Sequence, residues 1–175
     1  REVEGIPDDY GTAVTIQAMV FGNTGRDSGT GVLFTRNPST GADELFGDFL
    51  PAAQGEDVVS GAHQTFGLEE MKLISPVTVQ ELSEVAKSLE IVTTDMCDIE
   101  FTVEEKRLWI LQNRVGKRTP AAAIRIAVEM AKDPTFPLTR EQAIMRITPD
   151  QLKSALSMDQ VTTSSQVLAK GLGAS

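Results

Sequence analysis

Cysteine, histidine and aromatic residues are scarce in this chain of 175 residues. It has one cysteine, Cys97, and one histidine, His63, and aromatic residues make up only 5%. A single cysteine excludes an internal disulfide and suits a reducing compartment, which favours a cytoplasmic protein. A zinc site or a Ser–His–Asp triad within the chain is not expected, because neither HxxxH nor CxxC spacing is present. With so few aromatic residues, aliphatic packing must dominate the core.

Positive charge and long apolar runs are also lacking. The formal net charge is -9, and the isoelectric point is about 4.6. Attraction to nucleic acid needs clustered Lys and Arg, so no nucleic-acid partner is expected, although a metal or a few basic groups can still bind a polyanion locally. No apolar run approaches the roughly 20 residues of a membrane-spanning helix, and no signal-peptide pattern opens the chain. We therefore expect no membrane partner.

The order of apolar patterns predicts strands first and helices later. The β-branched run TAVTIQAMVF (12–21) is typical of a buried strand, and further strands are expected at 30–37 and 44–51. The segment QGEDVVSGAHQTFGLEE (54–70) is polar and predicted to be irregular. This order favours an α+β fold, an antiparallel sheet with packed helices followed by a small helical extension. The chain opens at Arg1 without Met, and we expect it to be a piece of a longer protein.

Helix signals dominate the second half of the chain. Apolar spacing predicts a helix at 77–92, and an Ala-rich run that opens with proline predicts another at 120–132. A capping box from Thr139 to Gln142 opens a third, and Thr148 caps a fourth. From Met158 onward the Ser/Thr/Gly-rich sequence predicts an exposed tail or the start of another module.

The segment DIEFTVEEKRLWILQNR (98–114) predicts a hairpin with polar side chains at matched positions. Residues two apart on a strand share a face, so Asp98 and Glu100 point together, as do Gln112 and Arg114. A turn at the charged tip puts both pairs on one side of the sheet, with opposed Cβ atoms ~5 Å apart. Glu100 and Gln112 can then hold Mg²⁺, and Arg114 can grip a phosphate. A solvated cross-strand ion pair is the alternative, and the hairpin alone favours it.

Other candidate residues each have a plain structural alternative. The glycine-rich loop GNTGRDSGTG offers backbone N–H groups to phosphate, with Thr30 and Gly31 at its end, or is simply a flexible loop. Gln17 and Met19 can face a flat apolar ligand such as a purine, although core packing is favoured by composition.

The adjacent carboxylates Glu56 and Asp57 can bind ribose hydroxyls or metal-bound water, or are surface charge. Trp109 and Leu111, which alternate with the polar positions of the hairpin, are predicted to lie in the core.

Taken in order, five motifs resemble a known family. They are GTAVTIQAMVFGN, SGTGVLFTRNPSTG, AQGEDVVSG, DMCDIEFT and LQNRVGKRTPAAAIRIAVEM. Their order resembles that of the pyruvate phosphate dikinase family over nearly all of the chain, and LAKGLGAS resembles the passage into its phosphohistidine domain. Phosphoenolpyruvate synthase and glucan water dikinase share the core pattern, but FTRNPSTG and GKRT favour the dikinase that acts on pyruvate.

The resemblance implies an ATP-grasp nucleotide-binding domain of an enzyme that interconverts ATP, phosphate and pyruvate with AMP, pyrophosphate and phosphoenolpyruvate. It assigns 1–118 to the C-terminal subdomain, 119–157 to a helical extension and 158–175 to a linker toward the phosphohistidine domain. That swivelling domain, carrying the acceptor histidine, and the N-terminal half of the grasp would be partners in the same protein, which is implied to be a homodimer. The alternatives are a phosphoenolpyruvate synthase-like fragment and a non-catalytic interaction module of this fold.

The resemblance also implies a role for each candidate. Glu100 and Gln112 would ligate Mg²⁺, Arg114 would stabilise the transferring phosphates, and Asp98 would assist at the nucleotide or metal. The other nucleotide-binding candidates are Gln17 and Met19 near the adenine, Thr30 and Gly31 near the phosphates, and Glu56 and Asp57 near the ribose. His63, in GAHQTF, does not match the TSHA-like motif of the acceptor histidine. The chain alone is therefore expected to be inactive.

Overall fold

A five-stranded antiparallel sheet forms the centre of the computed structural model, which describes residues 11, 13–60 and 63–161. The strands are β1 (Gly29–Phe34), β2 (Phe46–Pro51), β3 (Phe66–Gly67), β4 (Cys97–Glu104) and β5 (Arg107–Val115). They lie in the order β3-β2-β1-β4-β5, and each pair is antiparallel. The α+β fold with an antiparallel sheet is confirmed.

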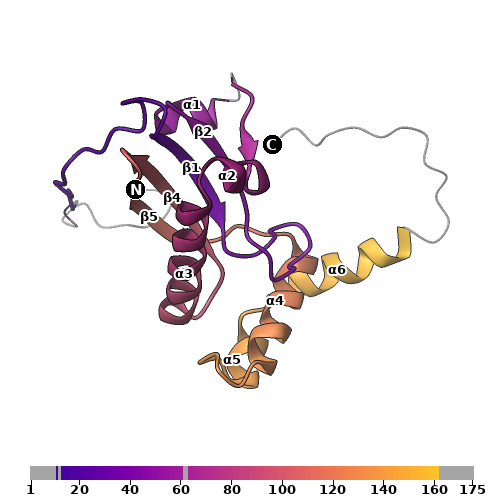
Figure 1. The fold of residues 1–175 in the computed structure, drawn as a ribbon. Coiled ribbons are helices and arrows are strands. Elements are labelled where there is room, and N and C mark those ends of the chain that lie inside the picture. The colour runs from indigo at the N-terminus through magenta and orange to yellow at the C-terminus, as the bar shows by residue number, and fades with distance from the viewer. Residues whose placement is uncertain (1–10, 12, 61–62, 162–175) are drawn as a thin grey trace.

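Six helices accompany the sheet in the described residues. They are α1 (Gly55–Val59), α2 (Leu68–Ile74), α3 (Pro76–Thr93), α4 (Pro120–Lys132), α5 (Arg140–Met145) and α6 (Pro149–Val161). Helices α2 and α3 cover one side of the sheet, whereas α4, α5 and α6 form an extension beyond it (Figure 1). The four predicted helices are confirmed, and α6 continues through residues 158–161, where a tail was expected. Residues 162–175 lie outside the described part. No described helix is long and apolar enough to span a membrane.

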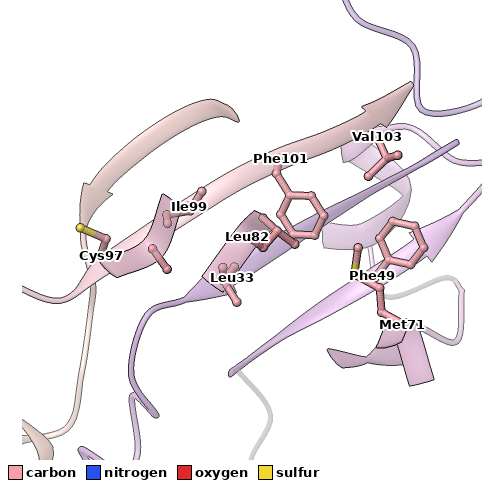
Figure 2. Close-up of a cluster of buried hydrophobic side chains, with 9 residues drawn as sticks. Leu33, Phe49, Met71, Leu82, Cys97, Ile99, Phe101 and Val103 are labelled. Carbon is pink, nitrogen blue, oxygen red and sulfur yellow. The ribbon is translucent and has the colours of Figure 1, made fainter. Parts of the chain in front are cut away.

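The main core lies between the sheet and the helices α2 and α3. Alternate residues of β4 point into it, so that Ile99 and Phe101 are fully buried (Figure 2). The rings of Phe101 and Phe49 stack with centroids 6.2 Å apart. A Cβ at Gly31 would lie 2.5 Å from the Phe101 ring and 2.6 Å from the backbone oxygen of Asp48, so only glycine fits there. The other members of this core are Leu33, Met71, Leu82, Ala86, Cys97 and Val103.

The hairpin turn lies where the charged tip predicted it. Glu105 and Lys106 have φ angles of 49° and 69°, and positive φ at both central residues is the feature of a type I′ turn. The glycine-rich loop supports this turn, because the Glu105 backbone N–H donates to Ser28 Oγ and the Lys106 N–H donates to the Asp27 carbonyl. The loop therefore packs against the hairpin.

The predicted strand at 12–21 is wrong in the part that the structure describes, residues 13–21. This segment forms no strand, and Ile16 is 95% exposed and Met19 72% exposed. A strand needs a hydrogen-bonded neighbour; β1, β2 and β4 are paired on both sides, and 13–21 joins neither open edge of the sheet, at β3 or at β5. No described strand pairs with 13–21, so its strand-forming residues have no partner to form backbone hydrogen bonds with.

The prediction of an irregular 54–70 segment is also wrong, because it contains α1, β3 and the start of α2. A capping box opens α1: the Gln54 backbone N–H donates to Asp57 Oδ2 over 2.8 Å, and the Asp57 N–H donates to the Gln54 backbone carbonyl over 3.0 Å. The short β3 then pairs with β2 at the edge of the sheet.

The helical extension is held to the loop that precedes β4. Arg118 makes two hydrogen bonds of 2.7 and 2.8 Å to the Asp95 carboxylate, and Arg146 donates to Thr94. Met96 is fully buried in a second core with Ala122, Ile126, Ala127, Met130, Leu138 and Ala143. The same short loop therefore connects this extension to the first strand of the hairpin.

Burial should make the Cys97 thiol unreactive. Cys97 is fully buried, and desolvation raises its pKa above the ordinary value of 9.0 despite a hydrogen bond with Thr93. Because only the thiolate attacks alkylating reagents, a higher pKa means a slower reaction at every pH below it. We expect iodoacetamide at pH 8 to label the Cys97 peptide at least about tenfold more slowly in the native protein than in urea, as measured by mass spectrometry. Equal rates in the two states would contradict the buried position.

Candidate functional site

The face of the sheet opposite α2 and α3 carries the polar side chains of the hairpin. Asp98 pairs with Arg114 and Glu100 pairs with Gln112 in the register of β4 and β5. Ile99 between them points into the core, so these four side chains share the other face. The predicted pairing of the hairpin is confirmed, and we call this set the hairpin face.

A bulge in β5 sets which residues reach the hairpin face. The register shifts between Glu100 and Phe101, which leaves Leu111 as an extra residue. Trp109 therefore pairs with Thr102 and shares the face of Gln112, although the two are three residues apart. The prediction that Trp109 and Leu111 are core residues is wrong: Trp109 is half-buried with Arg107 stacked 4.2 Å above its ring, and Leu111 is 38% exposed.

Arg114 binds both carboxylates of the hairpin face. Its Nε donates to Asp98 Oδ2 over 2.8 Å, and its Nη2 donates to Glu100 Oε1 over 3.1 Å. The hydrogen bond with Asp98, and then the charge of Asp98, raise the pKa of the already basic Arg114. The cross-strand ion pair that the sequence left open is therefore present, and it uses the same residues as the predicted metal and phosphate site.

Glu100 and Gln112 offer the oxygen ligands that Mg²⁺ prefers. A carboxylate and an amide lie directly opposite each other across two strands. Mg²⁺ usually takes one or two protein ligands and completes its shell with water and substrate phosphates. In the described part of the chain, no three His, Cys, Asp or Glu side chains cluster to hold a metal by themselves. The residues therefore fit a magnesium ion that arrives with phosphates rather than one bound by the protein alone.

The structure does not bring all the nucleotide-binding candidates to the hairpin face. Thr30 lies on that side, but it is buried, and its hydroxyl contacts the Phe101 carbonyl at 3.0 Å and Thr102 Oγ1 at 3.2 Å. Gly31 lies on the opposite, core side, where there is no room for a phosphate. Gln17 and Met19 are exposed in the unpaired segment 13–21.

Glu56 and Asp57 lie in the first turn of α1, beside the glycine-rich loop. Gln54 connects the two segments, because it accepts from the Gly22 N–H and donates to Asn23, each over 3.4 Å. Asp57 is committed to the capping box, whereas Glu56 is exposed. Sequence reasoning did not pick out Glu104, which lies farther along β4 on the same side as the hairpin face and accepts from the Phe21 N–H over 3.0 Å. The spacing of two residues from Asp98 to Glu100, continued along the strand, could have predicted that Glu104 lies on this side.

Comparison with known proteins identifies the class of this domain. Residues 1–66 match the family model of the pyruvate phosphate dikinase AMP/ATP-binding domain. Over these residues the chain therefore belongs to the class of AMP/ATP-binding domains.

Curated relatives identify the family. The chain is 50% identical to pyruvate, phosphate dikinase of Rickettsia prowazekii over 89% of its length. It is 49% identical to pyruvate, phosphate dikinase 1, chloroplastic, of Arabidopsis thaliana and 47% identical to pyruvate, phosphate dikinase 2 of Zea mays, in both cases over its full length. The chain accordingly belongs to the pyruvate, phosphate dikinase family over the part of those proteins that it matches. It spans only 18 to 20% of the length of these relatives.

Proposed function

We propose that this chain is the ATP- and Mg²⁺-binding part of a pyruvate, phosphate dikinase with an ATP-grasp nucleotide-binding domain. The observation that carries the proposal is the hairpin face, where Asp98, Glu100, Gln112 and Arg114 gather in one register. The whole protein would transfer a phosphoryl group from ATP through a carrier histidine to pyruvate, with inorganic phosphate as the second acceptor. The products are AMP, pyrophosphate and phosphoenolpyruvate.

Each residue of the hairpin face would act through charge and position. Phosphoryl transfer needs in-line positioning and neutralisation of spreading negative charge more than covalent help from the protein. Glu100 and Gln112 would hold Mg²⁺, which supplies positive charge to the phosphate oxygens. Arg114 would bind phosphate oxygens, and Asp98 would hold Arg114. A chain with net charge -9 can bind ATP in this way because the attraction is local.

The remaining parts of the site would come from elsewhere in the same protein. The exposed segment 13–21 is rich in β-formers, and we propose that it pairs with a strand of the N-terminal half of the grasp, which brings Gln17 and Met19 to the adenine. Glu56 would contact the nucleotide from the first turn of α1, which Asp57 caps, while Thr30 and Gly31 would support the sheet behind the site. The swivelling phosphohistidine domain would follow the helical extension in a cytoplasmic homodimer. This chain alone is proposed to be inactive.

Half-reactions of the full-length protein test this function. Glu100→Ala and Arg114→Ala should each slow phosphorylation of the protein by [γ-³²P]ATP or [β-³²P]ATP at least about 10³-fold, because each removes charge stabilisation at the phosphates. Exchange between pyruvate and phosphoenolpyruvate on the carrier histidine should stay at the wild-type rate, since that step does not use this site.

Two further measurements complete the test. Glu84→Gln removes a carboxylate from the exposed surface of α3 and should leave both half-reactions unchanged. Product analysis should find pyrophosphate, and its formation should depend on added inorganic phosphate. Release of free phosphate instead would indicate a phosphoenolpyruvate synthase. Normal phosphorylation from ATP in both hairpin-face variants would overturn the site.

A further inference from the structure

The two carboxylates of the hairpin face hold Arg114 in different ways. Asp98 is 11% exposed at its side chain and accepts the shorter hydrogen bond, 2.8 Å from Nε. Glu100 is 37% exposed and accepts 3.1 Å from Nη2 at the tip of the guanidinium. Nε lies nearer the stem of the side chain, so a bond there fixes the direction of the group and leaves the tip able to exchange its partner. The buried hydrogen bond to Asp98 thus fixes the position of Arg114, whereas the exposed hydrogen bond to Glu100 can be replaced by another partner.

The net charge of the hairpin face affects how it can bind a phosphate. Two carboxylates face one guanidinium, so the hairpin face has a negative excess that repels a polyphosphate. One of the two Nη2 N–H groups of Arg114 donates to Glu100 Oε1, so a phosphate oxygen at that N–H, or a cation at Oε1, would compete with this hydrogen bond. A metal bound through Oε1 and a phosphate bound at that N–H would therefore both displace the hydrogen bond between Glu100 and Arg114.

We propose that Glu100 exchanges partners between Arg114 and Mg²⁺, while Asp98 is the positioning residue that keeps Arg114 aimed throughout. The proposal rests on the proposed function and adds a coupling to it. When Mg²⁺ takes Glu100, the tip of Arg114 becomes free for a phosphate oxygen and the negative excess disappears. Each ligand thus favours the other, and linkage requires the effect to be reciprocal.

Binding of the β,γ-imido analogue of ATP to the full-length protein tests this exchange. Calorimetry with Mg²⁺, and with EDTA instead, gives the coupling as a ratio of dissociation constants. Glu100→Gln should tighten metal-free binding about fivefold, because it removes a negative charge that faces the phosphates and weakens the hold on Arg114, and it should remove most of the strengthening by Mg²⁺. Asp98→Ala should instead weaken binding about fivefold under both conditions, because Arg114 loses its anchor.

The pair Asp98→Ala and Asp98→Asn separates positioning from charge. Both remove the same negative charge, but Asn keeps an oxygen that accepts from Nε, so it should restore part of the affinity that Ala loses. Glu84→Gln on α3 controls for net charge and should bind as the wild type does. Thermal unfolding establishes that each variant is folded, and Arg114→Lys, which lacks the forked guanidinium, should lose the coupling to Mg²⁺.

Three outcomes are distinguishable. Opposite signs for Glu100→Gln and Asp98→Ala, with Asn between Ala and wild type, support the exchange. Equal tightening in all the carboxylate variants overturns it and leaves ordinary repulsion as the explanation, with the proposed function intact. If the wild type does not bind the analogue under either condition, the proposed function fails together with the exchange.

Discussion

Replacing Phe101 by alanine is expected to destabilise the sheet domain by about 3–5 kcal/mol, because the ring is fully buried and its removal leaves a cavity. The ring stacks on Phe49 and covers Gly31, which has no side chain to fill the space. Phe101 also lies between Glu100 and Thr102 on β4. The cavity therefore opens directly behind the hairpin face, and the loss of packing should extend to the candidate site.

Hydrogen exchange read by mass spectrometry measures this effect locally, which matters in a protein with several domains. Peptides from β1 and β4 should exchange faster in Phe101→Ala than in the wild type, while α4 peptides change little. Val115→Ala is the matched control, because Val115 is on the same hairpin but 61% exposed, and it should cost less than about 0.5–1 kcal/mol. Equal protection in the two variants would show that Phe101 does not support the sheet.

Sequence patterns located the hairpin better than they located the strands around it. Period-two spacing predicted the shared face of Asp98 and Glu100, and the charged tip predicted the turn, because both are local properties of β4 and β5. The bulge at Leu111 was not predictable, since one extra residue changes the face of Trp109 without any residue type that marks it. Alternation alone placed that tryptophan in the core, on the wrong side of the sheet.

Tertiary contacts explain the other differences. The segment 13–21 has strand-forming residues, but a strand also needs an available neighbour, which propensity does not report. Gly31 was a candidate because a glycine after a hydroxyl can admit a phosphate, yet the close contact it permits is with Phe101. The polar spacing of 54–70 concealed α1, whose capping box uses Gln54 and Asp57 rather than the more familiar Ser or Thr. The roles of the site residues remain predictions from the family resemblance.

The second large effect is expected for Glu90→Ala, which breaks a buried ion pair. Arg36 and Glu90 are 8% and 9% exposed, and Arg36 Nε and Nη2 donate to the carboxylate over 3.0 and 3.2 Å. Removing Glu90 leaves the buried Arg36 with only longer contacts, to Glu129 at 3.5 Å and to Asp43 at 3.8 Å, so we expect a cost of about 3 kcal/mol, the lower end for a broken buried pair. Thr35 also donates to Glu90, over 2.6 Å, and accepts from the Cys97 N–H. The loss of stability should therefore extend to Cys97, the residue before Asp98.

A double substitution decides between a charge effect and a packing effect. Arg36→Met together with Glu90→Leu removes both charges and keeps most of the volume, so it should be less destabilising than Glu90→Ala alone. Two further measurements should rank the variants in the same order as their stability: hydrogen exchange of the Cys97 amide, and the metal dependence of nucleotide binding. The reason is that Thr35 connects the ion pair to β4. If the double variant is the least stable, the pair stabilises the fold outright. If it regains stability but not nucleotide binding, the pair is retained because its Thr35 contact holds the start of β4, and with it Asp98, in place.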